Sequence, residues 1–318
     1  MMNLVNSLGV DLSSNNGTVD FSKLKSAGVK WCMLRLGYGN NSIDQDDTRI
    51  FNYAEQCTKL KIPFGVYLMS YALCESDCKS EIDHAKRVIN ALVANHYNIS
   101  LPVAIDIEPT DYTLNNGGYN ATVINCLVSL WNTKIREFGY LPMAYVGFDE
   151  YEKFNDTNRK NTNIWWAQWW TECGFSGNRK KLGIWQFGGE TNYIRNPIIP
   201  GVGIVDQNIM YVDYLKYLSE TGLSGYKHLK QTNDKPILDS YGIDKSQNNI
   251  GTYAFKQLLY IAHKTGVIKN AVDPNSSTVG NGTIKCINEF LAAEGYKPNG
   301  IAGVNFIKRL KNKIEKRL

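Results

Sequence analysis

Short apolar stretches rich in β-branched and aromatic residues alternate with longer amphipathic stretches as far as about residue 220. This alternation predicts an α/β domain with a largely parallel sheet, because each parallel strand needs a crossover connection, which is usually a helix. Eight strands with helices between them further predict that the sheet closes into a β/α barrel. The stretches typical of buried strands are 8–12, 31–36, 64–69, 103–107, 143–146, 164–168, 184–187 and 204–208.

Helical periodicity between these strands is clearest at 82–93 and 123–138, where apolar residues recur three and four positions apart. The region 223–249 carries turn formers and little periodicity, which predicts a linker. Three more helical patterns follow, at 251–266, 282–293 and 304–314. The sequence therefore predicts three parts: a barrel domain over 1–222, a linker over 223–249 and a small all-α domain over 250–318.

The C-terminal part differs from the rest in charge. From Tyr226 onward there are 15 Lys or Arg against 7 Asp or Glu, out of 35 and 30 in the whole chain. Such a basic module suits an acidic polymer, which includes nucleic acid, teichoic acid and the peptide carboxylates of a cell wall. Charge alone does not choose among these partners.

No stretch of about 18 apolar residues that could span a bilayer is present, so an integral membrane protein is not expected. Residues 1–7 lack a basic segment followed by an apolar one, and no secretory signal peptide is expected either. The seven cysteines are odd in number and several lie in apolar stretches, which predicts mostly free, buried thiols. None of the four histidines has a neighbouring Cys or Ser that suggests a catalytic triad.

Polar residues that close apolar strands are the candidates for chemistry, because a β/α barrel gathers its reactive groups at the carboxyl ends of its strands. Asp11 follows Gly9 and Val10, and Gln186 follows Ile184 and Trp185. Three acidic residues stand in the same way after their strands, at Asp106, Glu108 and Asp206.

Asp106 and Glu108 are two residues apart on a strand, so their side chains point to the same face. Two carboxyl groups in one pocket suit glycosidic bond cleavage, where a protonated acid donates to the leaving oxygen and an ionised one supports the oxocarbenium-like transition state. Two other interpretations stay open at this point. The pair can simply be solvated loop residues, or it can form a magnesium site with Asp11 and Asp206, although no phosphate-binding loop accompanies it.

The order and spacing of short motifs resemble glycoside hydrolase family 25 over roughly residues 8–215. The motifs at 9–13, 19–21, 35–39, 65–67 and 106–108 read GVDLS, VDF, RLGYG, GVY and DIE. Those farther along, at 144–145, 165–169, 185–187 and 205–208, read AY, WWAQW, WQF and VDQN. The resemblance implies a lysozyme that cleaves the β-1,4 bond between N-acetylmuramic acid and N-acetylglucosamine in peptidoglycan, on an irregular TIM-like barrel and without a metal or other cofactor.

The resemblance also implies roles for single residues. Glu108 is expected to be the proton donor. Asp106 is expected to orient and polarise the 2-acetamido group of the substrate for neighbouring-group attack, with a direct base or nucleophile role as the alternative. Asp11 and Asp206 complete the acidic rim. The expected groove wall, which binds sugar by stacking and amide hydrogen bonds, comprises Arg35, Tyr67, Tyr145, Trp165 and Gln186.

Each groove-wall residue also has a structural interpretation. The aromatic side chains can belong to the core, and Arg35 can be the buried ion-pair partner of one of the acids. Residues 284–308 are similar to a helical peptidoglycan-binding domain, whereas a bundle for folding or dimerisation is the alternative.

The sequence thus predicts a modular, endolysin-type lysozyme that acts on peptidoglycan. Its basic C-terminal domain is expected to bind the wall, with acidic wall polymers as candidate partners. Such an enzyme accumulates in the host cytoplasm and reaches the wall after the membrane is permeabilised, or is exported by a non-standard route. The alternative functions are a non-catalytic wall-binding protein on the same fold, which the intact Asp106 and Glu108 disfavour, and a nucleic-acid binder, which the acidic barrel disfavours.

Overall fold

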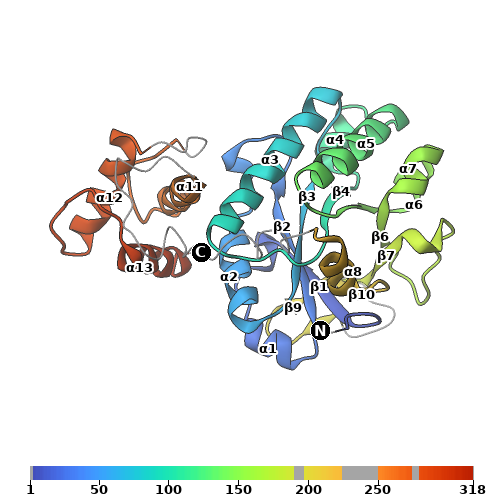
Figure 1. The fold of residues 1–318 in the computed structure, drawn as a ribbon, viewed down its shortest axis with the longest axis horizontal. Helices are drawn as coiled ribbons and strands as arrows, with labels where there is room; N and C mark the ends of the chain where they lie inside the picture. Colours follow the sequence, from blue (N-terminus) through green and yellow to red (C-terminus); the bar gives the residue numbers. More distant parts are fainter. Residues whose placement is uncertain (1–2, 190–196, 224–249, 274–278, 318) are drawn as a thin grey trace. The chain divides into compact units, whose positions relative to one another are not determined.

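A computed structural model describes residues 3–189, 197–223, 250–273 and 279–317 of the chain. They form two compact units, and the larger one contains a closed barrel of eight strands (Figure 1). Around the barrel the strand order is β1-β10-β7-β6-β5-β4-β3-β2, which confirms the predicted α/β barrel. The barrel strands are β1 (Leu8–Leu12), β2 (Trp31–Tyr38), β3 (Phe64–Met69), β4 (Val103–Ile107), β5 (Pro142–Val146), β6 (Asn163–Ala167), β7 (Leu182–Gly188) and β10 (Gln207–Met210).

The last barrel strand is where the structure departs from the sequence-based expectation. The predicted strand over 204–208 is split, because Ile204 ends a two-residue strand, β9 (Gly203–Ile204), that pairs with β8 (Ile198–Ile199) outside the barrel. The barrel is closed instead by β10, which runs antiparallel to both β1 and β7. The amino end of an antiparallel strand lies at the same rim as the carboxyl ends of its neighbours, so Asp206, directly before β10, still reaches that rim.

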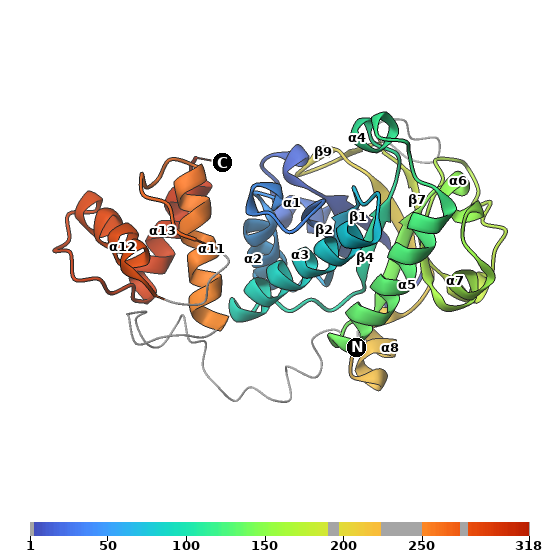
Figure 2. The same cartoon turned by 90° about the horizontal axis from the view of Figure 1, so that it is seen from above.

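Helices cover the outside of the barrel, as Figure 2 shows for α2 (Ile50–Leu60) and α5 (Ala121–Glu137). The stripe predicted over 123–138 lies in α5, where Leu127, Trp131 and Ile135 are buried. The stripe over 82–93 lies in α3 (Glu75–Ala94). The remaining helices of this unit are α1 (Phe21–Ser26), α4 (Asp111–Asn115), α6 (Phe148–Glu152), α7 (Asp156–Asn161) and α8 (Tyr214–Thr221), with short 3-10 helices at Ser14–Asn16, Ile43–Gln45 and Arg179–Lys181.

The barrel interior is filled by a layer of side chains from alternating strand positions. Trp31 and Met33 of β2, Ala104 of β4, Met143 of β5 and Ile184 of β7 belong to one buried cluster. Successive residues of a strand point to opposite faces, so the next inward position along each strand comes one layer closer to the rim. That layer holds the polar residues described below.

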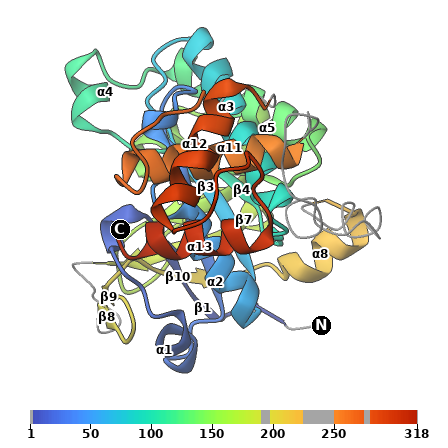
Figure 3. The same cartoon turned by 90° about the vertical axis from the view of Figure 1, so that its left-hand side faces the viewer.

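The smaller unit includes Arg87–Tyr97, at the end of α3, and three C-terminal helices. These helices are α11 (Ile250–Lys264), α12 (Asn281–Ala293) and α13 (Val304–Glu315), which lie together in Figure 3. All three predicted C-terminal helices are thus present. Phe306 of α13 packs edge to face against Phe255 of α11 and Phe290 of α12. The predicted linker, 223–249, lies outside the described residues except for Leu223.

None of the seven cysteines forms a disulfide, as predicted, and Cys32, Cys57, Cys78 and Cys286 are buried while Cys74 is exposed. No helix among the described residues is long and apolar enough to cross a membrane.

Candidate active site

The acidic residues singled out from the sequence meet at the rim of the barrel where β4 ends. Asp11 and Asp106 are inward positions of β1 and β4, one step above the apolar layer, and Glu108 lies one step beyond Asp106. Asp206 joins them through the antiparallel strand β10. The other three carboxyl groups lie close enough to Asp106 to raise its pKa.

A cavity of about 230 Å³ opens beside these groups. Asp11 and Asp206 contribute carboxyl groups to it, and Tyr67 and Trp169 contribute rings. Its other walls come from the turn after β1 and the segment before β10, namely Ser13, Asn15, Asn16, Ile204 and Val205. The cavity therefore offers a sugar both hydrogen-bonding groups and aromatic surface.

Asp106 is the most unusual carboxyl group of the site. It is only 6% exposed, and its Oδ1 has no hydrogen-bond partner among the described residues. Burial, followed by the charges of Glu108 and Asp11, raises its pKa well above the ordinary value, while Arg35 acts in the opposite direction. A buried oxygen without a partner is costly, so it is ready to accept a hydrogen bond from a substrate.

Glu108 is less enclosed than Asp106. Burial raises its pKa, and the charges of Asp11 and Glu150 add to the effect, while Arg35 again opposes it. A carboxyl group with a raised pKa keeps its proton to higher pH, which a general acid requires. Burial and the charges of Asp11 and Glu108 likewise raise the pKa of Asp206 to about 8.

Asp11 is held by two side-chain amides. Its Oδ2 accepts hydrogen bonds from Gln186 Nε2 at 3.1 Å and from Asn208 Nδ2 at 2.7 Å. Burial raises the pKa of Asp11, and these two hydrogen bonds lower it. The amides therefore stabilise a carboxylate that burial alone would neutralise.

Aromatic donors behind the amides fix their orientation. Gln186 Oε1 accepts from the Tyr145 hydroxyl and the Trp169 indole, each at 2.9 Å. Asn208 Oδ1 accepts from the Trp165 indole at 2.7 Å. Because each amide oxygen is occupied in this way, each amide nitrogen faces Asp11.

These contacts change the expectation for part of the groove wall. Trp165 is 1% exposed, with Tyr67 and Tyr145 packed edge-on against it at ring-centroid distances of 5.7 and 4.9 Å, so it has no open face for a sugar. Gln186 is 2% exposed. Both residues are at the site, but they support Asp11 and the two tyrosines from behind.

Arg35 lies in the same layer as Asp106, two positions beyond Met33. Its Nε donates to Asp47 Oδ2 at 2.9 Å and its Nη2 to the Ser14 hydroxyl at 3.0 Å. Burial lowers its pKa, but the charges of Asp47, Tyr67 and Asp106 outweigh this, so the net shift is upward. The ion-pair interpretation applies, although the partner is Asp47 rather than one of the four rim acids.

Several residues around the site were not predicted to belong to it. Asn208 and Trp169 stood within the family motifs but were not expected to act at the site, and Asp47 was not singled out.

A row of tyrosine rings also lies near the site: Tyr71 stacks on Tyr112 at a ring-centroid distance of 5.5 Å and packs against Tyr38 at 5.3 Å. The charges of Glu108 and Asp106 influence the pKa of Tyr71, which places the row beside the acids, and Tyr112 is 51% exposed.

Within the described ranges, no three His, Cys, Asp or Glu side chains are placed to hold one metal ion. The magnesium interpretation of the rim acids thus has no support from their geometry.

Comparison with known proteins gives matches to the barrel. The family model for glycosyl hydrolases family 25 matches residues 10–194. No curated protein sequence matches.

Solved structures with the same fold include the modular autolysin LytC from Streptococcus pneumoniae in complex with a synthetic peptidoglycan ligand, at 21% identity and a TM-score of 0.54. That match covers 64% of this chain and 46% of the autolysin, so it spans less than half of that protein. A family 25 glycosyl hydrolase from Bacillus anthracis matches at 17% identity and a TM-score of 0.52, over 68% of this chain and 94% of its own. The catalytic domain of endolysin ply40 from bacteriophage P40 of Listeria monocytogenes matches at 21% identity and a TM-score of 0.50, over 67% and 97%.

Proposed function

Because the chain belongs to glycosyl hydrolases family 25, we propose that it is a lysozyme that hydrolyses the β-1,4 bond between N-acetylmuramic acid and N-acetylglucosamine in bacterial peptidoglycan. The observation that carries the proposal is the pairing of Asp106 and Glu108 at the rim, both with raised pKa, beside an open cavity. Hydrolysis of a glycosidic bond needs a proton donor and a second carboxyl group within reach of the same sugar.

In the proposed mechanism, Glu108 gives its proton to the glycosidic oxygen as the bond from that oxygen to the anomeric carbon breaks. The acetamido oxygen of the same sugar forms a bond to the anomeric carbon, and Asp106 orients the acetamido N–H with its unpaired Oδ1. Water then attacks the anomeric carbon, the bond from that carbon to the acetamido oxygen breaks, and the water gives a proton to the Glu108 carboxylate, which restores the acid. Asp11, whose carboxylate the two amides stabilise, stabilises the developing positive charge on the sugar, and Asp206 completes the rim beside it.

Attack by the acetamido group determines the anomeric configuration of the first product. Two displacements at the anomeric carbon retain the β configuration in the first product, whereas direct attack by water inverts it. Proton NMR of the product in the first minutes of the reaction separates these routes. An α product would overturn the role given to Asp106 while leaving Glu108 as the proton donor.

The substrate assignment is tested with purified Gram-positive cell walls. The native protein should clear their turbidity and release reducing ends without new amino termini, and Glu108→Gln should abolish both effects. New amino groups in place of reducing ends would identify a peptidase or amidase. Full activity in the presence of a chelator is expected, since no step uses a metal ion.

The basic C-terminal part, over 250–318, is proposed to bind acidic groups of the cell wall. Such binding raises the concentration of the barrel at an insoluble substrate. Release into the wall after permeabilisation of the host membrane is the proposed route, as for a phage endolysin. A chain shortened by the residues from Tyr226 onward should sediment less with walls and still hydrolyse soluble fragments.

A further inference from the structure

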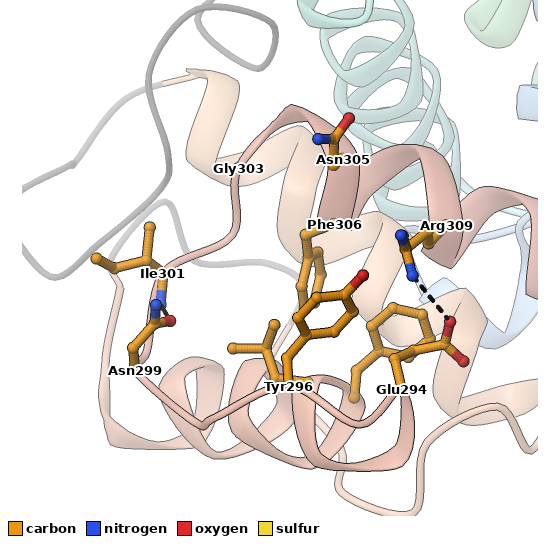
Figure 4. A pocket seen from close by; sticks show the side chains of 10 residues that line it. Glu294, Tyr296, Asn299, Ile301, Gly303, Asn305, Phe306 and Arg309 are labelled. Carbon is orange, nitrogen blue, oxygen red and sulfur yellow. Dashed lines mark hydrogen bonds and ion pairs between the residues drawn. The ribbon is translucent and has the colours of Figure 1, made fainter.

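The smaller unit contains a pocket of about 360 Å³ that the lysozyme mechanism does not use (Figure 4). It is formed by the end of α12, the segment that follows it and the first turns of α13. This volume falls at the lower end of the range of pockets that bind small molecules, roughly 300–1,000 Å³. The pocket therefore suits a ligand group of a few residues rather than an extended surface.

The apolar side of the pocket has little open aromatic face. Phe290 and Phe306 form its floor, packed edge to face at a centroid distance of 5.0 Å and only 2% and 6% exposed. At the mouth, Tyr296 and Ile301 are each 46% exposed, and the Arg309 guanidinium lies over the Tyr296 ring at 4.9 Å from its centroid. A pyranose ring stacks on a broad open ring face, whereas this lining favours methyl and other short alkyl groups.

The pocket lining contains one acidic and one basic side chain, Glu294 and Arg309. Glu294 is the acidic residue of the lining, and its carboxylate lies 3.0 Å from Lys313 Nζ and 3.9 Å from Arg309 Nη1. Lys313 makes the closer pair, and the Arg309 side chain is 48% exposed. Arg309 can therefore bind a second carboxylate, which its planar guanidinium does with two parallel hydrogen bonds.

Two amides complete the lining. Asn299 Oδ1 accepts from the Ile301 backbone N–H at 3.0 Å, which leaves the Asn299 Nδ2 group directed elsewhere. Asn305 is exposed at the start of α13. Both asparagines line the pocket, so their amide nitrogens can donate to the carbonyl oxygens of a peptide bound there.

We propose that this pocket binds the carboxyl end of a short peptide with small alkyl side chains, with Arg309 on the carboxylate, Asn299 and Asn305 on peptide carbonyls, and the alkyl groups on Phe290 and Phe306. Peptide stems of bacterial walls that end in alanine belong to this class. The inference rests on the proposed wall-binding role of this unit, and it assigns to that role a pocket and a ligand.

The test uses the full chain and two synthetic probes, acetyl-Lys-D-Ala-D-Ala with a free carboxyl group and its C-terminal carboxamide, titrated by calorimetry or NMR. The free acid should bind saturably, and the carboxamide about tenfold more weakly, the effect of one charge-assisted hydrogen-bonded pair. Arg309→Gln should weaken the acid about tenfold and abolish the difference between the probes. The matched control is Lys308→Gln, which removes one charge from an exposed position of the same helix outside the pocket and should leave both affinities unchanged.

Absence of saturable binding to the native chain, or equal affinities of Arg309→Gln and the native chain for the acid, would overturn the proposal. Equal losses in Arg309→Gln and Lys308→Gln would also overturn it, because they would indicate a diffuse polyanion surface. Hydrolysis of soluble glycan fragments is measured on the same preparations. Its failure would refute the lysozyme assignment and leave the peptide titration valid, whereas failed peptide binding with normal hydrolysis refutes only the pocket.

Discussion

The cavity at the barrel rim and the pocket of the helical unit are built from opposite kinds of groups. The first holds Asp11, whose pKa is raised by burial, and Asp206, whose pKa is raised by burial and by the charges of Asp11 and Glu108. The second holds Arg309 over an aromatic ring, a cation that keeps its charge at any physiological pH. A site that moves protons needs groups near their titration point, and a site that only recognises a ligand needs fixed charges. Mutations should therefore separate turnover from retention on the wall.

The sharpest separation should come from Glu108→Gln, which keeps the shape of the side chain and removes the proton to be donated. We expect kcat on soluble glycan fragments to fall by about 10²–10⁴-fold, the usual contribution of a general acid. Sedimentation with cell walls should be unchanged, since the smaller unit is untouched. Loss of both hydrolysis and sedimentation in this variant would contradict the assignment of turnover to the barrel and of wall binding to the smaller unit.

A smaller loss of turnover is expected from Asn208→Leu, which removes the 2.7 Å hydrogen bond to Asp11. The remaining amide lowers the pKa of Asp11 less, so Asp11 is more often neutral and kcat at pH 6 should fall by about tenfold to a hundredfold. The destabilisation should be about 1–3 kcal/mol, since the Trp165 indole loses its acceptor.

The control for this variant is Asn158→Leu, because Asn158 is also a buried asparagine with amide hydrogen bonds, in α7. It should lose comparable stability in denaturant unfolding and keep its kcat. Equal kcat values for the two variants would show that the amide beside Asp11 is only structural.

Arg309→Gln should weaken the affinity of the protein for cell walls by about tenfold and leave hydrolysis of soluble fragments normal. The measurement is the bound fraction after sedimentation with walls at several protein concentrations. Normal retention would mean that the smaller unit binds the wall elsewhere.

The smallest effect concerns stability. The pKa of Asp206 rises from 3.8 to about 8 in the folded protein, so the folded state favours the protonated carboxyl group. This contribution is fully present below pH 3.8 and is lost as the pH rises towards 8. Asp206→Asn, which cannot ionise, should raise Tm by a few degrees at pH 8 and progressively less towards pH 4.

Thermal unfolding across this pH range checks the prediction, with the exposed Asp83→Asn as control. A gain in Tm that does not depend on pH would contradict the origin given for it.

Much of this architecture was predictable because it follows from local periodicity. The alternation of strand residues places Asp106 and Glu108 on one face, and a strand read from its apolar residues locates the rim. β10 escaped the prediction because it is short and antiparallel, and the apolar residues Ile204 and Val205 precede it. Contacts between strands leave no local pattern: Asn208 and Gln186 meet Asp11 from 197 and 175 residues away.

The partner of Arg35 could not be predicted from local sequence pattern either, although it lies only 12 residues away. A single arginine among four acids suggests that it pairs with one of them, yet Asp47 accepts its hydrogen bond. Asp47 also accepts from the backbone N–H groups of Ser14 and Arg49, so three donors converge on one carboxylate. Only the fold of the loops after β1 and β2 brings those donors together.

The two side-chain amides beside Asp11, those of Gln186 and Asn208, also block proton transfer to it. A hydroxyl or an imidazole passes a proton along a hydrogen-bonded chain by gaining one and releasing another, but a side-chain amide does not ionise at working pH. The Tyr145 hydroxyl is therefore connected to Asp11 structurally through Gln186 and isolated from it for proton exchange. Protons therefore do not reach Asp11 through Gln186 or Asn208, whereas the cavity that Asp11 lines gives them a route from solvent and substrate.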